Sequence, residues 1–283
     1  MKNFIRQYLF ANTIMELFLI GISKIYYPVH KLFPFNTHYP KGTYRKVMRE
    51  GLIFNLDISD YQEYLVYFDM SADSSKPILN HLPTANGIII DIGANIGYTA
   101  LLMAKRLEQQ NVSVIAFEPY PSTFIKLEEN LGLNKFKNIK AENIALGSTE
   151  SELMMVQDCP SNSGGYRAFN PNTHIHGNVI KVTQTALDTY LEGNRDSIIF
   201  IKIDVEGYEF NSLLGAMHTI RKHMPMLYIE LCDKNLRDQG SSAEQLTGLI
   251  ETFGYNTILN AQTLAPIESR DLENCSFDII CKK

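Results

Sequence analysis

From residue 87 onward, the chain alternates short apolar runs with segments of helical length, and this alternation restricts the fold more than any other feature. The apolar runs are IIID (88–91), VSVIAFE (112–118), IKAENIAL (139–146), IIFIKID (198–204), MLYIEL (226–231), NTILN and FDIICK. Apolar runs of this length, bounded by turn residues and separated by helices, are typical of a mostly parallel sheet with both faces covered. We therefore expect an open α/β fold.

The alternation breaks between the third and fourth of these runs, where SELMMVQD and GNVIKVTQT look like additional strands. We expect an inserted β element over about 147–197. Residues 51–70 mix short alternation with aromatic residues and are expected to form a strand pair and a turn. The predicted organisation is an N-terminal amphipathic helix and linker over 1–50, followed by one domain over 51–283.

The charge of the chain is unevenly distributed. The net charge is −5, yet residues 1–46 carry seven Lys or Arg against one acid, Glu16, which leaves −11 for the remaining 237 residues. The main body therefore has too little positive charge for a broad nucleic-acid-binding face, and we expect no nucleic-acid partner. Four cysteines without a paired spacing indicate free thiols in a reducing compartment, so we expect a cytoplasmic location.

Residues 1–25 form an apolar stretch that charges interrupt before it reaches the ~20 clean residues of a membrane span. The stretch also has no signal-peptide cleavage site. On a helical wheel its polar residues share one arc; they are Lys2, Arg6, Asn12, Thr13, Glu16, Ser23 and Lys24. Two interpretations stay open. The helix packs on the protein itself or on the partner of a homodimer, or it lies in the interface at the inner face of a membrane, with Lys and Arg toward anionic head groups.

A carboxylate followed by a tight glycine turn ends the first apolar run, in DIGANIG (91–97). In an open α/β sheet, ligands bind beyond the carboxyl ends of the strands. Gly93 and Gly97 let the backbone turn sharply and approach a ligand, and Asn95 tolerates a left-handed conformation. The helix that begins near Tyr98 presents unpaired amide donors at its start. A nucleotide-like ligand is the expected occupant.

The spacing of the glycines narrows the class of nucleotide. Gly93 and Gly97 form G-x-x-x-G rather than the G-x-G-x-x-G that binds a pyrophosphate. Asp91, directly before this turn, would repel a diphosphate but attract a cationic amino-acid moiety. Glu118 ends the next strand, 21 residues after Gly97, where a carboxylate can accept hydrogen bonds from both ribose hydroxyls. These features fit S-adenosylmethionine better than NAD.

Five blocks of the sequence resemble conserved blocks of the FkbM-type methyltransferases, in the order and spacing of that family. The blocks are IIIDIGANIGYTALLMAK, VIAFEPYPSTFIKLEENLGLN, NIALGS, FIKIDVEGYEFNSLLGA and PMLYIEL. The resemblance runs over residues 85–232 and does not cover residues 1–50 or 153–180. It implies a class I, Rossmann-like methyltransferase fold, whose seven-stranded, mostly parallel sheet has an antiparallel strand near the C-terminus, here with an N-terminal helical and β extension. It also implies methyl transfer from S-adenosylmethionine, mostly to hydroxyls of natural products or glycans.

The resemblance also assigns cofactor-binding residues by position. The glycine turn and the acid before it would line the methionine side of the cofactor, with Asp91, Gly93, Ala94, Asn95 and Gly97. The later strand ends would bind the nucleoside, with Glu118 at the ribose, Pro119 and Tyr120 beside the adenosine, and Asn143 or Ala145 near the adenine. In the plainer alternative, the glycines serve only the turn between strand and helix, and Glu118 only favours the start of the next helix.

A second group of acids follows the run FIKI (200–203). Asp204 ends this strand beside the expected cofactor site, Glu206 follows closely, and Glu230 ends the next strand. Methyl transfer from a sulfonium is an in-line displacement, so the enzyme must align the acceptor and remove its proton. Asp204 or Glu206 can serve as the base. Alternatively, all three acids hold Mg²⁺, or Glu206 only caps the following helix.

His174 and His176, in the NTHIHGN segment of the inserted element, are the other candidate bases. They share one face if this segment is extended. As an exposed loop pair they need no function, and nothing in the sequence fixes the geometry of a transition-metal site around them.

These residues favour an S-adenosylmethionine-dependent O-methyltransferase that acts on a small-molecule or glycan acceptor, such as a glycan, a glycolipid or a related natural product. Two alternatives stay open: a scaffold that binds S-adenosylmethionine without catalysis, and an NAD(P)-dependent oxidoreductase. The intact Asp91, Gly93, Glu118 and Asp204 argue against the scaffold. The missing G-x-G-x-x-G argues against the oxidoreductase.

Overall fold

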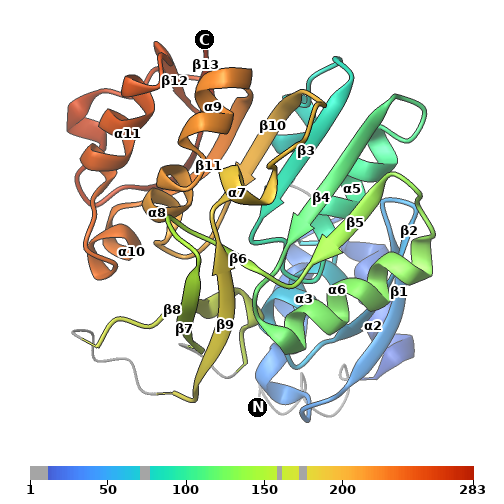
Figure 1. Cartoon of the computed structure of the whole chain (residues 1–283). Coiled ribbons are helices and arrows are strands. Elements are labelled where there is room, and N and C mark those ends of the chain that lie inside the picture. Colours follow the sequence, from blue (N-terminus) through green and yellow to red (C-terminus); the bar gives the residue numbers. More distant parts are fainter. Residues whose placement is uncertain (1–11, 71–76, 158–160, 172–176) are drawn as a thin grey trace. The chain divides into compact units, whose positions relative to one another are not determined.

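The computed structural model describes residues 12–70, 77–157, 161–171 and 177–283. The chain forms two compact units (Figure 1). The first unit contains Met1–Ser75 and Pro160–Gly164, and the second contains Lys76–Cys159 and Gly165–Lys283.

The first unit is built around a two-stranded antiparallel hairpin with short helices. Its elements are α2 (Thr13–Ser23), η2 (Tyr27–Leu32), η3 (Asn36–His38), β1 (Tyr44–Arg49), β2 (Leu52–Asp57) and α3 (Tyr61–Tyr67). The hairpin turns through Glu50 and Gly51, which both have positive φ (51° and 68°), as a two-residue turn matched to the twist of the strands requires. Asp60 caps α3 and also accepts hydrogen bonds from the backbone nitrogen (2.6 Å) and hydroxyl (2.9 Å) of Ser163.

Helix α2 packs on its own unit through a side that contains Glu16, Leu19 and Ile20. Glu16 is fully buried, and its carboxylate accepts hydrogen bonds from the Arg45 guanidinium and the Tyr67 hydroxyl, both at 3.0 Å. Leu19 and Ile20 are buried on the same side. The polar arc of the helical wheel therefore faces the protein at Glu16, and apolar side chains of α2 are left in solvent.

The second unit contains the seven-stranded sheet that the sequence predicts. Its strands are β3 (Gly87–Ile92), β4 (Val112–Phe117), β5 (Ile139–Glu142), β10 (Ile198–Ile203), β11 (Met226–Cys232), β12 (Thr257–Asn260) and β13 (Ser276–Lys282). They are arranged in the order β12-β13-β11-β10-β3-β4-β5 (Figure 1). The last strand, β13, runs antiparallel to both of its neighbours, and the other pairs are parallel. This confirms the expected class I methyltransferase fold.

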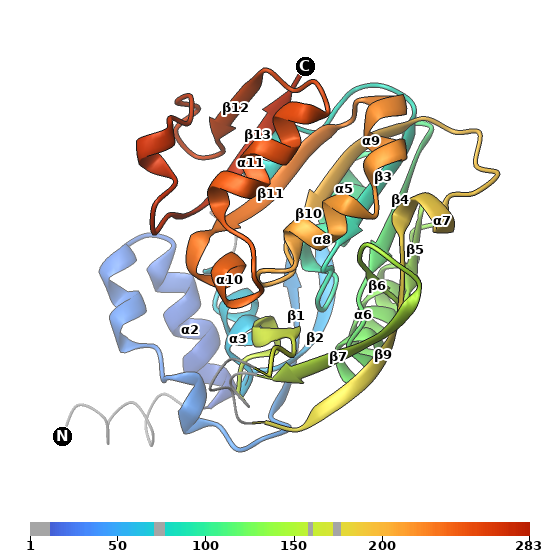
Figure 2. The same ribbon diagram turned by 60° about the vertical axis from the view of Figure 1, so that its left-hand side comes forward.

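Helices cover both faces of this sheet because its central strands are apolar on both sides. One face packs on α5 (Tyr98–Arg106) and α6 (Pro121–Asn134). The other face packs on a second group of helices: α7 (Leu187–Tyr190), α8 (Glu209–Leu214), α9 (Met217–His223), α10 (Asp233–Asp238) and α11 (Ala243–Thr252). Figure 2 shows α8, α9 and α11 along β10 and β11.

Between β5 and β10 the chain builds a second sheet of four strands. They are β6 (Ala145–Leu146), β7 (Ser151–Gln157), β8 (Tyr166–Ala168) and β9 (Val179–Thr185), in the order β6-β9-β7-β8. Strand β7 pairs antiparallel with both β8 and β9. No helix in the described ranges is long and apolar enough to cross a membrane.

Candidate active site

The carboxyl ends of β3 and β10 mark the place where the strand order of the large sheet reverses. From β3 the chain continues to β4 on one side, while β10 pairs with β3 on the other side. In open α/β sheets the crevice outside two such strand ends is where ligands bind. Asp91 is the penultimate residue of β3, and Asp204 directly follows β10. The two acids predicted from the sequence therefore meet at the switch point of the sheet.

Lys202 joins these two acids. Its ammonium nitrogen lies 3.1 Å from Oδ1 of Asp91 and 3.4 Å from Oδ2 of Asp204. It also donates a hydrogen bond to the carbonyl of Gly93 at 3.2 Å. Asp91 and Lys202 are buried, whereas the side chain of Asp204 is 46% exposed. The structure thus places one carboxylate inside the protein, one at the surface, and a single ammonium group between them.

The charges of this cluster depend on one another. Burial raises the pKa of Asp91, and the charge of Lys202 opposes that shift. Burial also lowers the pKa of Lys202, but the charges of Asp91 and Asp204 outweigh burial and hold it above its ordinary value. Lys202 therefore stays protonated at neutral pH. Since Asp91 is completely enclosed, its effect on a ligand passes through Lys202 and the surrounding backbone.

The glycine turn after β3 is strained in the way that only small residues tolerate. Gly93, Asn95 and Gly97 all have positive φ, of 80°, 49° and 86°. A Cβ atom on Gly93 would lie 1.8 Å from the backbone oxygen of Asp204, so this turn touches the loop after β10 directly. The backbone nitrogen of Asp204 also donates to the carbonyl of Ile92 at 3.0 Å. The glycine turn and Asp204 are thereby held against each other.

Glu118 connects the loops that follow β3 and β4. One carboxylate oxygen accepts a hydrogen bond from the backbone nitrogen of Asn95, and the other accepts one from that of Tyr120, both at 2.9 Å. Burial raises the pKa of Glu118 to about 7, although both amide bonds lower it. A carboxylate has about four acceptor positions, so Glu118 can still receive hydrogen bonds from ribose hydroxyls.

The remaining positions that the sequence assigns to the cofactor differ in their surroundings. The side-chain amide of Asn143 donates to the carbonyls of Glu118 (2.8 Å) and Pro119 (3.0 Å), so it fixes the loop after β4. Ala94 and Ala145 are buried in the hydrophobic core. The ring of Tyr120, beside Pro119, stacks on that of Tyr166 with 3.5 Å between the centroids.

Glu206 lies in a turn with φ of 54°, and its carboxylate accepts a hydrogen bond from the side-chain amide of Asn235 at 3.0 Å. Burial raises the pKa of Glu206 to about 8, and the neighbouring charges of Asp204 and Glu209 add to this shift. Glu209 closes the same turn, since its carboxylate accepts from the backbone nitrogens of Val205 and Gly207. Glu209 therefore has a structural role in this turn.

Glu230 is enclosed at the end of β11. Its Oε2 atom is buried without a hydrogen-bond partner among the described residues. Burial, followed by the charge of Asp204, raises its pKa to about 10. On the same face of β11, the Tyr228 hydroxyl donates to Asp278 at 2.8 Å. Both effects favour the neutral form of Glu230.

The predicted magnesium site is not supported by the described part of the chain. There, no three His, Cys, Asp or Glu side chains come together in a way that would hold a metal ion. Two of the three acids already have other partners, since Asp204 faces Lys202 and Glu206 accepts a hydrogen bond from Asn235. The other two candidate bases, His174 and His176, lie outside the described residues.

Two features of the site have no role in the sequence-based prediction. Lys202 stands in an otherwise apolar strand, and a lysine in such a buried position signals a nearby carboxylate. The Tyr228–Asp278 pair joins β11 to a strand about 50 residues further along, and no local pattern indicates it. The position of Lys202 next to a carboxylate could be inferred from the sequence once the strand order is known. The Tyr228–Asp278 pair could not be inferred in this way.

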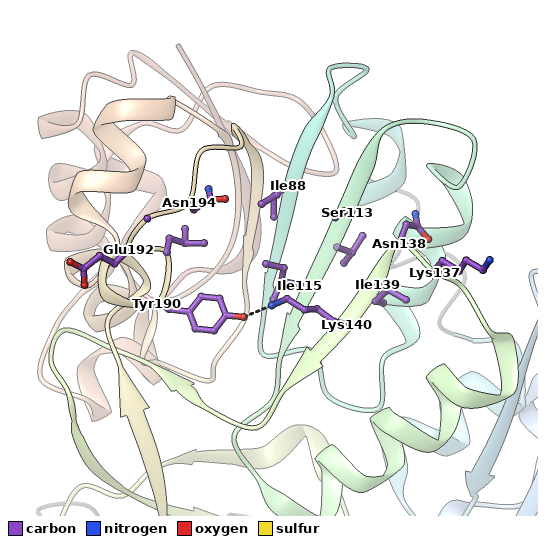
Figure 3. Close-up of a pocket in the computed structure, with 13 residues that line it drawn as sticks. Ile88, Ser113, Ile115, Lys137, Asn138, Ile139, Lys140, Tyr190, Glu192 and Asn194 are labelled. Carbon is purple, nitrogen blue, oxygen red and sulfur yellow. Dashed lines mark hydrogen bonds between the residues drawn. The ribbon is translucent and has the colours of Figure 1, made fainter.

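A cavity of about 550 Å³ lies elsewhere on the second unit (Figure 3). Ile88, Ser113 and Ile139 line it from the first or second residue of their strands, so it is at the amino ends of β3, β4 and β5. Tyr190 and Lys140 face each other across it, with 2.7 Å between the hydroxyl and the ammonium group. None of the candidate site residues lines this cavity.

Comparison with known proteins identifies the family. Residues 91–257, more than half of the chain, match the family described as methyltransferase FkbM domain. Methyltransferase 1 of Beauveria bassiana is 26% identical over 198 residues, which are 64% of this chain and 77% of the relative. Methyltransferase sdnD of Sordaria araneosa is 28% identical over 187 residues, in an alignment that covers 56% of this chain and 71% of the relative.

A solved structure of a methyltransferase FkbM from Methylobacillus flagellatus KT superposes with a TM-score of 0.48 and 18% identity. It covers 71% of this chain, which itself spans only 45% of that protein. The family match agrees with the motifs at the strand ends and confirms the resemblance drawn from the sequence. The chain belongs to the FkbM methyltransferase family.

Proposed function

We propose that this methyltransferase takes its methyl group from S-adenosylmethionine and transfers it to a hydroxyl of a glycan, a glycolipid or a related natural product. The observation that carries the proposal is the cluster at the switch point. There a solvent-reaching carboxylate, Asp204, is held by Lys202 and by the backbone against the glycine turn that follows β3.

The residues around this turn suit S-adenosylmethionine in charge and in hydrogen bonding. The cofactor carries a sulfonium and an ammonium group, and Asp204 offers a negative charge at the surface. Glu118 retains acceptor positions for ribose hydroxyls after binding Asn95 and Tyr120. The turn does not have the second glycine of a pyrophosphate-binding loop, which disfavours NAD.

When bound, S-adenosylmethionine would supply an electrophilic methyl group, with S-adenosylhomocysteine as the leaving group. The chain itself must align the acceptor and remove the hydroxyl proton. We assign Asp204 as the acceptor of that proton; its exposure to solvent and its contact with Lys202 support this role. Since Lys202 remains protonated, its ammonium group can hold the Asp204 carboxylate in position.

The test is transfer of labelled methyl groups from S-adenosylmethionine to glycan and glycolipid fractions, with wild type, Asp204→Asn and a surface control, Asp196→Asn. We expect Asp204→Asn to lower transfer by ~10²-fold, a much larger effect than its effect on binding of S-adenosylhomocysteine. The control, an exposed loop residue, should behave as wild type.

The linkage of the transferred label tests the acceptor group. A methyl ether on a hydroxyl survives mild alkali, whereas a methyl ester on a carboxyl group is cleaved to methanol. Label that leaves with mild alkali would contradict the hydroxyl acceptor. An Asp204→Asn enzyme with normal turnover would remove Asp204 as the base. Binding of the cofactor without transfer to any fraction would favour the non-catalytic scaffold.

A further inference from the structure

The inserted four-stranded sheet meets the loop after β4 in an aromatic contact. The ring of Tyr166, the first residue of β8, stacks on the ring of Tyr120 with 3.5 Å between the centroids and 16° between the planes. The sequence resemblance places Tyr120 beside the adenosine of the cofactor, whereas Tyr166 lies in the segment 153–180, which the resemblance does not cover. The inserted sheet therefore contacts a residue that is assigned to the nucleoside.

The backbone of the loop that carries Tyr120 is held by hydrogen bonds. The backbone nitrogen of Tyr120 donates to Glu118 at 2.9 Å, so the position of Tyr120 affects the carboxylate that is assigned to the ribose. Directly after β5, the amide of Asn143 donates to the carbonyls of Glu118 (2.8 Å) and Pro119 (3.0 Å). These bonds fix the backbone of the loop, and the stack with Tyr166 fixes the ring of Tyr120.

Strand β8 can hold an aromatic ring in place because it is itself anchored. The guanidinium of Arg167 pairs with Asp238, at the end of α10, at 3.3 Å. The carbonyl of Ala168 accepts a hydrogen bond from the side-chain amide of Gln239 at 2.8 Å. Strand β8 also pairs with β7 along its whole length. The position of Tyr166 is therefore set by the strand as well as by the stack.

The stacked pair is only partly enclosed. Both rings pack on the hydrophobic cluster of Ala145, Met155 and Val182, and Ala145 is one of the two positions assigned to the adenine. Yet Tyr120 and Tyr166 both keep part of their surface in solvent. Nucleobases stack on accessible aromatic rings of this kind. The pair therefore has the chemistry and the exposure that a contact with the adenine requires.

We propose that Tyr166 is a positioning residue for the nucleoside of the methyl donor, because its ring holds that of Tyr120 in the orientation that receives the adenine. This role rests on the proposed function, since it requires S-adenosylmethionine at these strand ends. It also assigns part of the inserted sheet to the methyl donor rather than to the acceptor.

Calorimetric titration of S-adenosylhomocysteine into the full chain tests this role. We expect Tyr166→Ala to weaken binding by ~10-fold, the size of one lost aromatic contact, and Tyr166→Phe to bind as wild type because it keeps the ring. The double variant Tyr120→Ala/Tyr166→Ala should bind no more weakly than Tyr120→Ala alone, since Tyr166 acts through Tyr120. The matched control is Met154→Ala, which removes a 38% exposed side chain from β7 of the same sheet and should leave binding unchanged.

The kinetics of labelled methyl transfer give a second readout. Tyr166→Ala should raise the KM for S-adenosylmethionine by a similar factor at an unchanged kcat. A lower kcat at an unchanged KM, together with a lower melting temperature, would show that Tyr166 only stabilises the sheet, and the proposal would be wrong.

Other results of the titration would also overturn the proposal. If the wild type and Tyr166→Ala bind S-adenosylhomocysteine equally well, the methyl donor stays at these strand ends but Tyr166 has no part in binding it. The ring is not the cause if Tyr166→Phe binds as weakly as Tyr166→Ala, or if Met154→Ala loses as much affinity. Losses that add up in the double variant would show that Tyr166 does not act through Tyr120. Absence of binding in the wild type would refute the proposed function itself, and this role with it.

Discussion

Replacing Lys202 by Met tests whether the ammonium group holds the switch-point acids together. Methionine has a similar length and fits an apolar strand, so the substitution removes the charge with little change in volume. Asp91 would then be completely buried without a cation at 3.1 Å, while Asp204 keeps contact with solvent. Removal of the Lys202 ammonium group therefore affects mainly Asp91.

Removing one partner of a buried ion pair costs about 3–5 kcal/mol of unfolding free energy, because the remaining charge stays uncompensated. The matched control is Lys181→Met. Its pair with Glu152 is shorter, at 2.7 Å, but both side chains are more than 60% exposed. An exposed pair of this kind contributes about 0–1 kcal/mol. Burial, rather than distance, should decide which substitution destabilises the protein.

Urea unfolding followed by circular dichroism measures both variants at pH about 5.5 and about 8. Without Lys202, the folded-state pKa of Asp91 rises further above its unfolded value. A carboxyl with a raised folded pKa loses stability as pH increases through that pKa, so the cost of Lys202→Met should be larger at the higher pH. The double variant Asp91→Asn/Lys202→Met should recover about half of the lost stability or more, because no buried charge is left.

This reasoning fails if Lys202→Met costs no more than Lys181→Met. It also fails if the cost of Lys202→Met does not change with pH, since Asp91 would then not be the group left unpaired. A double variant as unstable as the single one would point to packing rather than charge as the cause.

Three further predictions concern the same strand ends. Glu230→Gln should leave the melting temperature unchanged near pH 5 and raise it progressively toward pH 9, because the wild-type carboxyl has a pKa of about 10 and loses stability as pH rises from its unfolded value. Gly93→Ala should unfold the protein at much lower urea concentration than Gly132→Ala, since a Cβ meets Asp204 at Gly93 and open space at Gly132. Methyl transfer should survive EDTA, because Asp204 faces Lys202 and Glu206 binds Asn235; a loss that Mg²⁺ reverses would contradict this.

The parallel sheet and the acids at its edge were predictable because they depend on local pattern. Apolar runs of strand length predict β3, β10 and β11, and an acid after each run places a carboxyl group at the same edge. Strand order, however, is a matter of long-range pairing. Only the register of Lys202 beside Asp91 shows that this lysine lies between two carboxylates.

The orientation of α2 was not predictable from its sequence. A helical wheel separates polar from apolar residues but does not say which side faces the protein. Glu16 points inward because Arg45 and Tyr67, 29 and 51 residues away, supply its hydrogen bonds. In the same way, Glu118 was assigned only to a ligand, whereas the structure shows that it also binds two backbone amides.

Calorimetric titration of S-adenosylhomocysteine and of NADH into the purified protein tests the central claim most directly. We expect saturable binding of S-adenosylhomocysteine and none of NADH. Glu118→Gln should weaken that binding by about 1–3 kcal/mol, whereas Glu128→Gln, on the exposed side of α6, should not change it. Binding of NADH without S-adenosylhomocysteine, or the same affinity in both variants, would contradict the assignment of these strand ends to the methyl donor.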